Sequence, residues 1–248
     1  MRQSVWSHGV RSLLVALGLL LGVSGLCQGF NIDLDIFTGP PNTGNGAPSS
    51  AFGAAAGQPG FWNRLSLSGG SHKLRDLADK PSGATMTITT TGKGFGGIGF
   101  LFEGNSGDHA LLLNDAAQVG TLIQGGDLTY SFRGLTEGLY EVYTYAVNVA
   151  GFVIDTPVLI PQGDEPRVQV VTGPMPGNSF EYLITHSKHR VTISTSGYFQ
   201  VIFEQPPAEK TNQCVNGFQI ASVPEAGTGA ALSAFLAFMF VKRLGIGK

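Results

Sequence analysis

Hydrophobic and polar residues alternate along the chain from about residue 30 to residue 222. Polar residues separate Phe30, Ile32 and Leu34, and a period of two places successive side chains on opposite faces of a strand. Further strand-like segments lie at 85–89, 95–102, 127–132, 139–145, 167–171, 190–195, 198–203 and 215–220. Gly, Pro, Asn and Asp separate these segments, as they do in turns. The pattern predicts about nine or ten strands, each with one buried face.

Helical periodicity is missing from the same region, because no long stretch carries apolar residues three and four positions apart. Strands at this density without crossover helices form antiparallel sandwiches or barrels. We therefore predict an all-β protein, with one antiparallel, jelly-roll-like β-sandwich over residues 30–222.

The first 29 residues have the order of a secretory signal peptide. Arg2 and Arg11 give a basic start, residues 13–26 are apolar, and small residues follow. The apolar run is shorter than the ~20 residues that span a bilayer. We expect cleavage after Gly29, with a cut after Gly25 as an alternative. An uncleaved anchor or a buried helix is the competing interpretation.

The last residues, 223–248, combine a short motif, an apolar run and a basic end. Val223-Pro224-Glu225 comes first, residues 227–241 carry no charge, and Lys242 and Arg243 follow. Basic residues beside a membrane span stay in the cytoplasm, and their long side chains let a short run cross a thin bilayer. We predict a transmembrane helix at about 227–241, which anchors an exported precursor in the cytoplasmic membrane.

This C-terminal arrangement resembles the PEP-CTERM sorting tag of Gram-negative bacteria. Val223, Pro224 and Glu225 correspond to the sorting motif, and Lys242 and Arg243 to the membrane-flanking basic cluster. Ala226 departs from the proline of the third motif position. The resemblance implies processing by an exosortase-like enzyme and release to the cell surface or the extracellular matrix. A plain C-terminal anchor is the alternative.

The body carries a second resemblance. Residues 134–143, 216–220 and 47–63 are similar to segments of exported bacterial jelly-roll domains, which resemble galactose-binding-like modules in architecture. The resemblance implies a fold and brings no active site with it.

Charge and cysteine content narrow the functional classes. Residues 30–222 hold 10 basic and 16 acidic residues, a net charge of −6. This acidic balance argues against a nucleic-acid-binding protein, which needs cations facing phosphates. Cys27 falls within the predicted signal, so Cys214 stands alone in the mature chain, where we expect a core residue. The sandwich is then held by its core rather than by an internal disulfide.

No catalytic motif emerges from the sequence. His186 and His189 are three residues apart before a predicted strand, where such a spacing points to opposite faces, so we expect no zinc site. Residues 105–109 place Ser, Asp and His together, which we interpret as a turn because a catalytic triad converges from separate segments. Residues 92–97 lack the Gly-Lys-Ser/Thr ending of a phosphate-binding loop. We predict a protein that is not an enzyme.

Ligand-binding candidates lie in one short segment. Trp62, Asn63 and Arg64 place an aromatic plate beside an amide and a guanidinium, a set suited to stacking on sugars and bonding their hydroxyls. Burial of Trp62 in the core is the competing interpretation. The segment follows a long Gly- and Pro-rich loop, 38–60, which we interpret as a flexible surface connection, with a binding loop as the alternative.

Four carboxylates are candidate oxygen ligands for Ca²⁺: Asp33, Asp35, Asp108 and Asp115. No contiguous loop motif joins them, so we expect no cofactor, with a structural Ca²⁺ as the alternative.

These features predict an exported, surface- or matrix-routed non-enzymatic β-sandwich protein that is adhesive or associated with exopolysaccharide. The alternatives are a carbohydrate-binding module and a secreted hydrolase that acts on polysaccharide with a pair of carboxylates.

Overall fold

The structure is a computed structural model that describes residues 28–35, 45–67, 69–93, 96–119, 126–205 and 213–224. The predicted apolar helix at 227–241, Glu225 and the basic cluster Lys242-Arg243 lie outside the described residues, as does most of the predicted signal peptide. Within the described part of the chain, no helix is long and apolar enough to cross a membrane.

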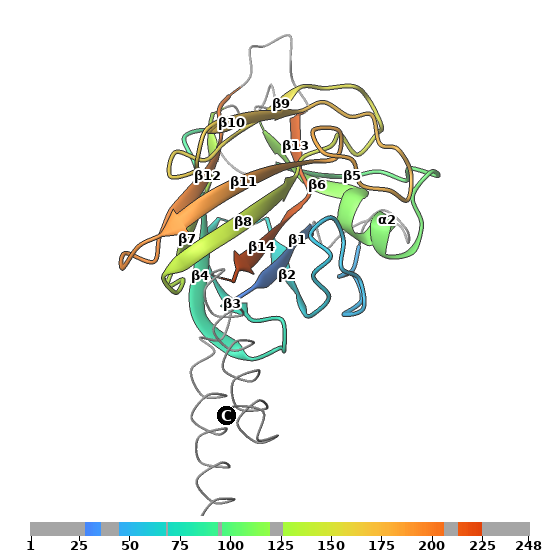
Figure 1. The fold of residues 1–248 in the computed structure, drawn as a ribbon. Helices are drawn as coiled ribbons and strands as arrows, with labels where there is room; N and C mark the ends of the chain where they lie inside the picture. The colour runs from blue at the N-terminus through green and yellow to red at the C-terminus, as the bar shows by residue number, and fades with distance from the viewer. Residues whose placement is uncertain are drawn as a thin grey trace, which may run out of the picture.

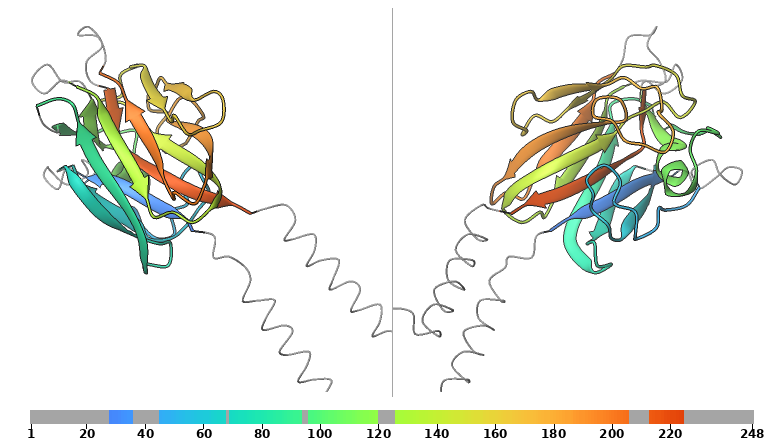
Figure 2. Two further views of the ribbon diagram at one scale, coloured as in Figure 1. Left: turned by 90° about the vertical axis from the view of Figure 1, so that its left-hand side faces the viewer. Right: turned by 45° about the vertical axis from the view of Figure 1, so that its right-hand side comes forward.

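Two large sheets form the body (Figures 1 and 2). The five-stranded sheet has the order β11 (His186–Ile193), β8 (Gly138–Tyr145), β14 (Gly217–Val223), β1 (Phe30–Asp35) and β2 (Trp62–Ser66). The six-stranded sheet has the order β10 (Val168–Val171), β9 (Thr156–Leu159), β12 (Phe199–Phe203), β7 (Leu128–Arg133), β4 (Pro81–Thr90) and β3 (Gly70–Arg75).

A small third sheet joins β13 (Gln213–Val215), β6 (Asp115–Val119) and β5 (Gly96–Gly99), and a short helix, α2 (Gly107–Leu113), precedes β6. All strand pairs are antiparallel except β1–β2, which is parallel. The predicted antiparallel β-sandwich is thus confirmed at the level of its architecture. The expected turn at 105–109 is wrong, because Ser106 is the N-cap of α2.

Aromatic side chains from both large sheets fill the space between them. The ring of Phe218 in β14 lies 4.8 Å from that of Tyr130 in β7 and 5.6 Å from that of Phe132, measured between centroids. Phe132 in turn stacks on Phe199 at 4.7 Å. Such close aromatic pairs stabilise the sandwich beyond the burial of their area, and they fix which face of the five-stranded sheet points inward.

Strand β1 is buried on both faces, unlike the half-buried strand that its alternation predicts. Its apolar side chains face the core, while the opposite face carries Asn31, Asp33 and Asp35, each with 0% of its surface exposed. The segment 45–60 covers this polar face: Asn31 donates to the carbonyl of Gln58 at 3.1 Å, and Asp35 accepts from the N–H of Gly46 at 2.9 Å.

The body of the chain begins and ends at the same end of the sandwich. Strands β1 and β14 are antiparallel neighbours, with Phe30 opposite Ile220, so the chain enters and leaves the body at the same end (Figure 2). Val223 is the last residue of β14, opposite Leu139 of β8. The predicted boundary at residue 222 therefore cuts the last strand one residue early.

Candidate functional site

The outer face of the five-stranded sheet divides into a covered half and an open half. Over β1, β2 and part of β14 the segment 45–60 lies against the sheet. Over β8 and β11 the charged side chains of Glu141, Lys188 and Arg190 reach the surface. We call this open half the β8–β11 face, defined by Glu141, Tyr143, Lys188 and Arg190 on the two strands and by Tyr182 on the loop that precedes β11.

The covered half is held by a hydrogen-bond network rather than by a flexible connection. The main-chain N–H of Ala55 donates to the hydroxyl of Tyr145 at 2.8 Å, and that of Ala56 donates to Oε1 of Gln219 at 3.0 Å. Gln219 donates from Nε2 to the carbonyl of Gly53 at 3.0 Å. Tyr145 and Gln219 thus fix the segment 45–60 to the sheet, and the expected flexible surface connection is wrong for these residues.

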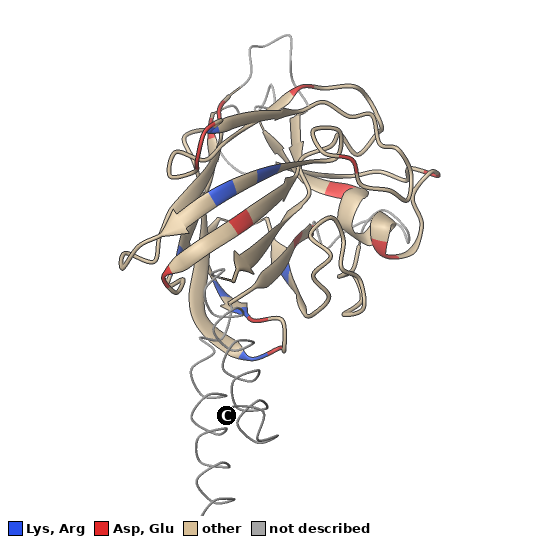
Figure 3. Cartoon of the chain, in the orientation of Figure 1, with Lys and Arg blue, Asp and Glu red and all other residues tan. Residues whose placement is uncertain are grey.

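On the β8–β11 face, the strand register brings opposite charges together. Lys188 lies directly opposite Tyr143, and Arg190 lies opposite Glu141. The ammonium of Lys188 lies 2.9 Å from Oε1 of Glu141 and 5.4 Å from the centre of the Tyr143 ring. The hydroxyl of Tyr143 donates to Oε2 of Glu141 at 3.0 Å. Figure 3 shows basic positions on β11 beside an acidic position on β8.

Tyr182 adds an exposed aromatic ring next to these charges. Its side chain is 53% exposed, and its hydroxyl donates to Oε1 of Gln169 at 3.2 Å. Gln169 also accepts from the main-chain N–H of Lys188 at 2.9 Å and donates to its carbonyl at 2.7 Å. An amide from β10 therefore joins the Tyr182 loop to the edge of β11.

The Tyr182 loop has an unusual backbone. Leu183 adopts a φ of 63°, a left-handed conformation that costs free energy for a residue with a side chain. Bonds on both sides hold it: its N–H donates to the carbonyl of His186 at 2.8 Å, and its carbonyl accepts from the N–H of Thr172 at 3.0 Å. The conformation sets the position of Tyr182 above the edge of the sheet.

His186 lies between the buried ring of Tyr143 and the exposed ring of Tyr182. Its ring centre is 5.7 Å from that of Tyr143 and 6.3 Å from that of Tyr182. Burial, together with the charge of Lys188, lowers the pKa of His186 to about 4, so the ring is neutral at pH 7. Three rings therefore follow one another in the order Tyr143, His186 and Tyr182; Tyr143 and His186 are buried, and Tyr182 is the exposed ring of the three.

Lys188 beside these rings is charged at neutral pH. The hydrogen bond to Glu141 raises the pKa of Lys188, and burial raises the pKa of Tyr143. The face thus offers aromatic surface, an ammonium and a carboxylate to a ligand. A neutral, polar and ring-shaped ligand can stack on the exposed aromatic ring and form hydrogen bonds with the ammonium and the carboxylate.

The structure places the predicted ligand-binding segment away from the β8–β11 face. Trp62 is only 3% exposed, and its indole N–H donates to the carbonyl of Phe52 at 3.2 Å. Its ring lies beneath the segment 45–60, 6.0 Å from the ring of Phe52. Trp62 therefore presents no open plate for a sugar, and the competing interpretation, a buried tryptophan, agrees with its position.

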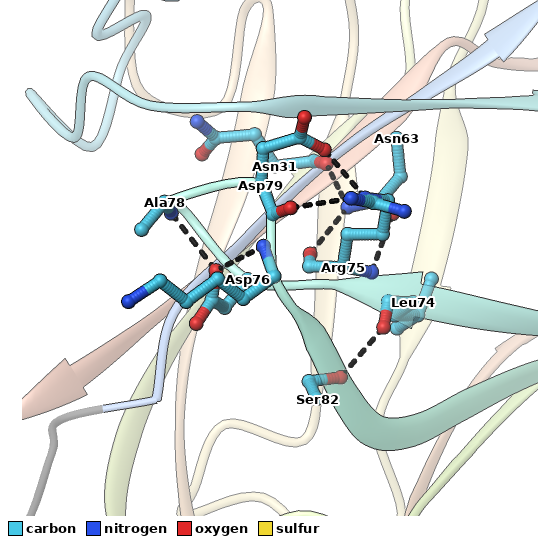
Figure 4. Close-up of polar contacts among 9 residues, drawn as sticks. Asn31, Asn63, Leu74, Arg75, Asp76, Ala78, Asp79 and Ser82 are labelled. Atoms are coloured by element: carbon cyan, nitrogen blue, oxygen red, sulfur yellow. Dashed lines mark hydrogen bonds and ion pairs between the residues drawn. The ribbon is translucent and has the colours of Figure 1, made fainter.

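Asn63 and Arg64 are also engaged within the fold. Asn63 donates to the carbonyls of Asn31 at 3.1 Å and Arg75 at 2.9 Å, and accepts from the N–H of Arg75 at 2.8 Å. Figure 4 shows these contacts where β2 meets β3. Arg64 forms an ion pair with Asp35 and donates to Asn45. The three residues stabilise the covered half of the sheet.

Three of the four calcium candidates meet in the interior. Asp33, Asp35 and Asp115 are fully buried, and the charges of Asp115 and Asp35 both act on Asp33. Asp108 lies apart at the start of α2, where its carboxylate accepts from the N–H and the hydroxyl of Ser49, each at 2.7 Å. Across the described ranges, no group of three His, Cys, Asp or Glu side chains is already arranged around a metal position.

The two histidines and the cysteine that the sequence singled out lie in strands of the body. His186 faces outward and His189 inward, in agreement with the predicted opposite faces. Cys214 is buried as expected, and its burial raises the pKa of the thiol to about 12. Of the sorting motif, Val223 and Pro224 are described and Glu225 is not.

Sequence reasoning did not find Tyr182 or Gln169. Tyr182 lies outside every predicted strand, and Gln169 is the inward residue of a short edge strand. Neither carries a motif, because their juxtaposition with Lys188 arises only when the edges of the two sheets meet. The alternation of residues 139–145 places Glu141 and Tyr143 on one face of a strand, and this pattern is the sequence signal for that part of the site.

Comparison with known proteins gives a likeness of fold alone. No protein-family profile matches the chain, and no curated protein sequence matches it. The module TmCBM61, solved in complex with β-1,4-galactotriose, is 11% identical with a TM-score of 0.33, covering 56% of this chain and 88% of that one. An exo-β-1,3-galactanase from Phanerochaete chrysosporium is 15% identical with a TM-score of 0.31, covering 62% and 29%.

A third solved structure is the GH115 4-O-methyl-α-glucuronidase BtGH115A, with 15% identity, a TM-score of 0.32 and coverage of 54% of this chain. The chain spans 17% of that enzyme and 29% of the galactanase. These values describe a coarse similarity between β-sandwiches.

Proposed function

We propose that this chain is an exported, non-enzymatic, jelly-roll-like β-sandwich that binds extracellular polysaccharide through the β8–β11 face. The observation that carries the proposal is the exposed Tyr182 ring, anchored by Gln169 beside the Lys188–Glu141 ion pair. Sugar rings have apolar faces and hydroxyl edges. Stacking on Tyr182, with hydrogen bonds from Lys188 and to Glu141, matches both parts.

An open sheet face suits a polymer better than a small molecule. Arg190 and Thr192 extend the β8–β11 face along β11, and both are exposed. A polysaccharide chain lying along the strands meets several of these groups in turn, so weak contacts with successive sugars add up. Because a polysaccharide repeats the same sugars, one matrix chain offers many binding positions, which suits adhesion to a matrix or to a cell surface.

Binding fits the described carboxylates better than hydrolysis does. A glycosidase needs two carboxyl groups on either side of the scissile bond, about 5–10 Å apart. Asp33, Asp35 and Asp115 are fully buried and cannot touch a polymer. On the β8–β11 face, Glu141 is occupied by Lys188 and Tyr143, which favours a binding role.

The route of export belongs to the same proposal. A signal at 1–29 and a sorting tag at 223–248 deliver the body across the cytoplasmic membrane, and an exosortase-like enzyme releases it. The exit of both chain ends from one edge of the sandwich supports this arrangement, since a tether there leaves the β8–β11 face free to meet its ligand.

Polysaccharide binding is tested by affinity gel electrophoresis of the full chain in non-ionic detergent, with soluble galactan, mannan, xylan and alginate in the gel. We expect retardation by at least one polymer. Tyr182→Ala removes the stacking ring and should weaken that retardation about tenfold, which corresponds to about 1.4 kcal/mol.

The matched control is Tyr198→Ala. Tyr198 directly precedes β12 of the other sheet, and the guanidinium of Arg133 lies over its ring, 4.4 Å from the centroid. Its loss removes a partly exposed tyrosine without touching the β8–β11 face, so retardation should be unchanged. An equal loss in both variants, or migration that no polymer alters, contradicts the proposal.

A further inference from the structure

The arginines of the described ranges differ in what their guanidinium groups contact. Three of them form an ion pair with a carboxylate: Arg64, Arg75 and Arg167. The guanidinium of Arg133 lies over the ring of Tyr198, 4.4 Å from its centroid. Arg190 is the exception, because it is exposed and its side chain forms no hydrogen bond, ion pair or ring contact with any other residue that the structure describes.

The strand register gives Arg190 a carboxylate as its neighbour, but that carboxylate is occupied. Arg190 lies directly opposite Glu141 in the antiparallel pair of β11 and β8, a position in which opposite charges stabilise a sheet. Oε1 of Glu141 lies 2.9 Å from the ammonium of Lys188, and Oε2 accepts from the hydroxyl of Tyr143 at 3.0 Å. The Lys188–Glu141 pair is therefore balanced in charge, and the guanidinium of Arg190 is left over.

The loop beside β11 does not supply a carboxylate for Arg190 either. The N–H of Asp164 donates to the carbonyl of Arg190 at 2.8 Å, which places the two main chains side by side. The carboxylate of Asp164 nevertheless takes part in none of the ion pairs between described residues. The next residue of that loop, Glu165, is held by Arg167 at 3.1 Å. Arg190 therefore presents its N–H donors to the solvent.

A free guanidinium on a binding face favours one class of ligand. Its N–H donors form a planar fork, and two parallel donors of the fork match two oxygens of a carboxylate or of a sulfate group. Such charge-assisted pairs are about twice as strong as hydrogen bonds between neutral groups. A sugar hydroxyl offers a single oxygen and uses only part of the fork. The ligand that fits Arg190 best is therefore an anion with two or more oxygens.

We infer that Arg190 selects polysaccharides that carry acidic sugars, by binding the carboxylate or sulfate group of one sugar through its guanidinium. The inference rests on the proposed function, since it assigns a ligand class to the β8–β11 face. Tyr182 and the Lys188–Glu141 pair serve the sugar ring and its hydroxyls, which are common to neutral and acidic polymers. Arg190 adds the contact that distinguishes the two kinds of polymer.

Arg190 and Tyr182 contact different sugars of the same polymer. The ring of Tyr182 lies 6.3 Å from that of His186 at the start of β11. Arg190 follows His186 on the same face of the strand, about 13 Å further along it. One sugar ring is too short to reach from Tyr182 to Arg190, so a free acidic monosaccharide does not bridge the two residues. A polymer lying along β11 reaches both, and the two contacts add in free energy.

The test compares polymers that differ only in their acidic groups. Polygalacturonate and its methyl ester share one backbone, as do a sulfated galactan and its desulfated product. Each polymer is immobilised, and the Kd of the full chain in non-ionic detergent is measured by surface plasmon resonance. We expect an acidic polymer to bind about tenfold more tightly than its neutral counterpart, and about 500 mM NaCl should reduce this ratio by screening. A preference within the first pair identifies a carboxylate as the bound group, and a preference within the second pair identifies a sulfate.

Variants locate the selection at Arg190. Arg190→Gln should raise the Kd for the acidic polymer about tenfold, which removes the preference. Arg190→Lys keeps the charge and loses the planar fork, so it should retain a preference of about threefold. Arg167→Gln is the matched control, because it changes an exposed arginine that Glu165 already neutralises; it should keep the full preference. Tyr182→Ala should weaken the binding of both polymers by the same factor and leave their ratio as it is.

The outcomes separate this inference from the proposed function. If each neutral polymer binds as tightly as its acidic counterpart, or if the preference persists in Arg190→Gln, the inference is wrong while polysaccharide binding stands. If no polymer of either kind binds the wild-type chain, the proposed function fails and the inference fails with it. The comparison within each pair on the wild-type chain tests the preference for acidic sugars without any variant.

Discussion

His186 makes the stability of the candidate site depend on pH. Its ring is buried beside Tyr143, Tyr145 and Phe180, and this burial lowers its pKa to about 4. In the unfolded chain the pKa is about 6.5, so between these values the unfolded state binds more protons than the folded state. The stabilising contribution is therefore complete above pH 6.5 and is lost as the pH falls towards 4.

Urea unfolding at pH 7 and at pH 5 measures this contribution. For His186→Gln, the fall in the free energy of unfolding between the two pH values should be smaller than for the wild type by about 1–2 kcal/mol. Equal falls in the two proteins would show that the histidine is protonated in the folded state as easily as in the unfolded one.

At the scale of elements, the segment 45–60 behaves as part of the sheet that it covers. The hydroxyl of Tyr145 accepts from Ala55 at 2.8 Å and donates to Gln219. Tyr145→Phe removes this hydroxyl and leaves the N–H of Ala55 without its acceptor, which should lower the free energy of unfolding by about 1–3 kcal/mol.

Limited proteolysis distinguishes a local effect from a general one. In Tyr145→Phe, new cleavage sites should appear within 45–60 before any appear in the strands, because the cover opens first. Uniform cleavage throughout the body would show that the hydroxyl supports the whole sandwich instead.

The elements also show how far the sequence could be interpreted. Residues 127–132 and 139–145 were predicted as two strands joined by a glycine-bearing turn, because both alternate cleanly. Both strands exist as β7 and β8, but they lie in different sheets. Strand β6 was not predicted, because nearly every side chain of Asp115–Val119 is buried and its polar and apolar residues do not alternate. Strand β3 escaped because it is an exposed edge strand, Gly70–Arg75, with little apolar content.

The candidate site was harder to predict than the strands. Tyr182 and Gln169 reach Lys188 from a loop and from the other sheet, and no local pattern encodes that meeting. Trp62 shows the reverse case, since an aromatic residue beside an amide and a guanidinium suits a sugar in sequence, yet the fold buries it. The carboxylates Asp33 and Asp115 were recognised by chemistry, while their proximity came from the packing of β6 against β1.

At the scale of the whole molecule, the end of β14 sets where the chain can be cut. A chain ending at Pro224 keeps β14 complete and lacks the predicted anchor, so we expect it in the soluble periplasmic fraction or in the medium. A chain ending at Asn216 loses β14 from the centre of the five-stranded sheet and should aggregate or be degraded. Cell fractionation followed by a salt wash separates these outcomes; membrane association of the longer chain would reveal a second anchor.

The neighbouring positions of β1 and β14 also determine the order of events during synthesis. Phe30 and Ile220, 190 residues apart in sequence, are partners in the finished sheet, and β14 separates β1 from β8. Contacts between such distant residues slow folding. The five-stranded sheet therefore cannot be completed until its last strand has been made.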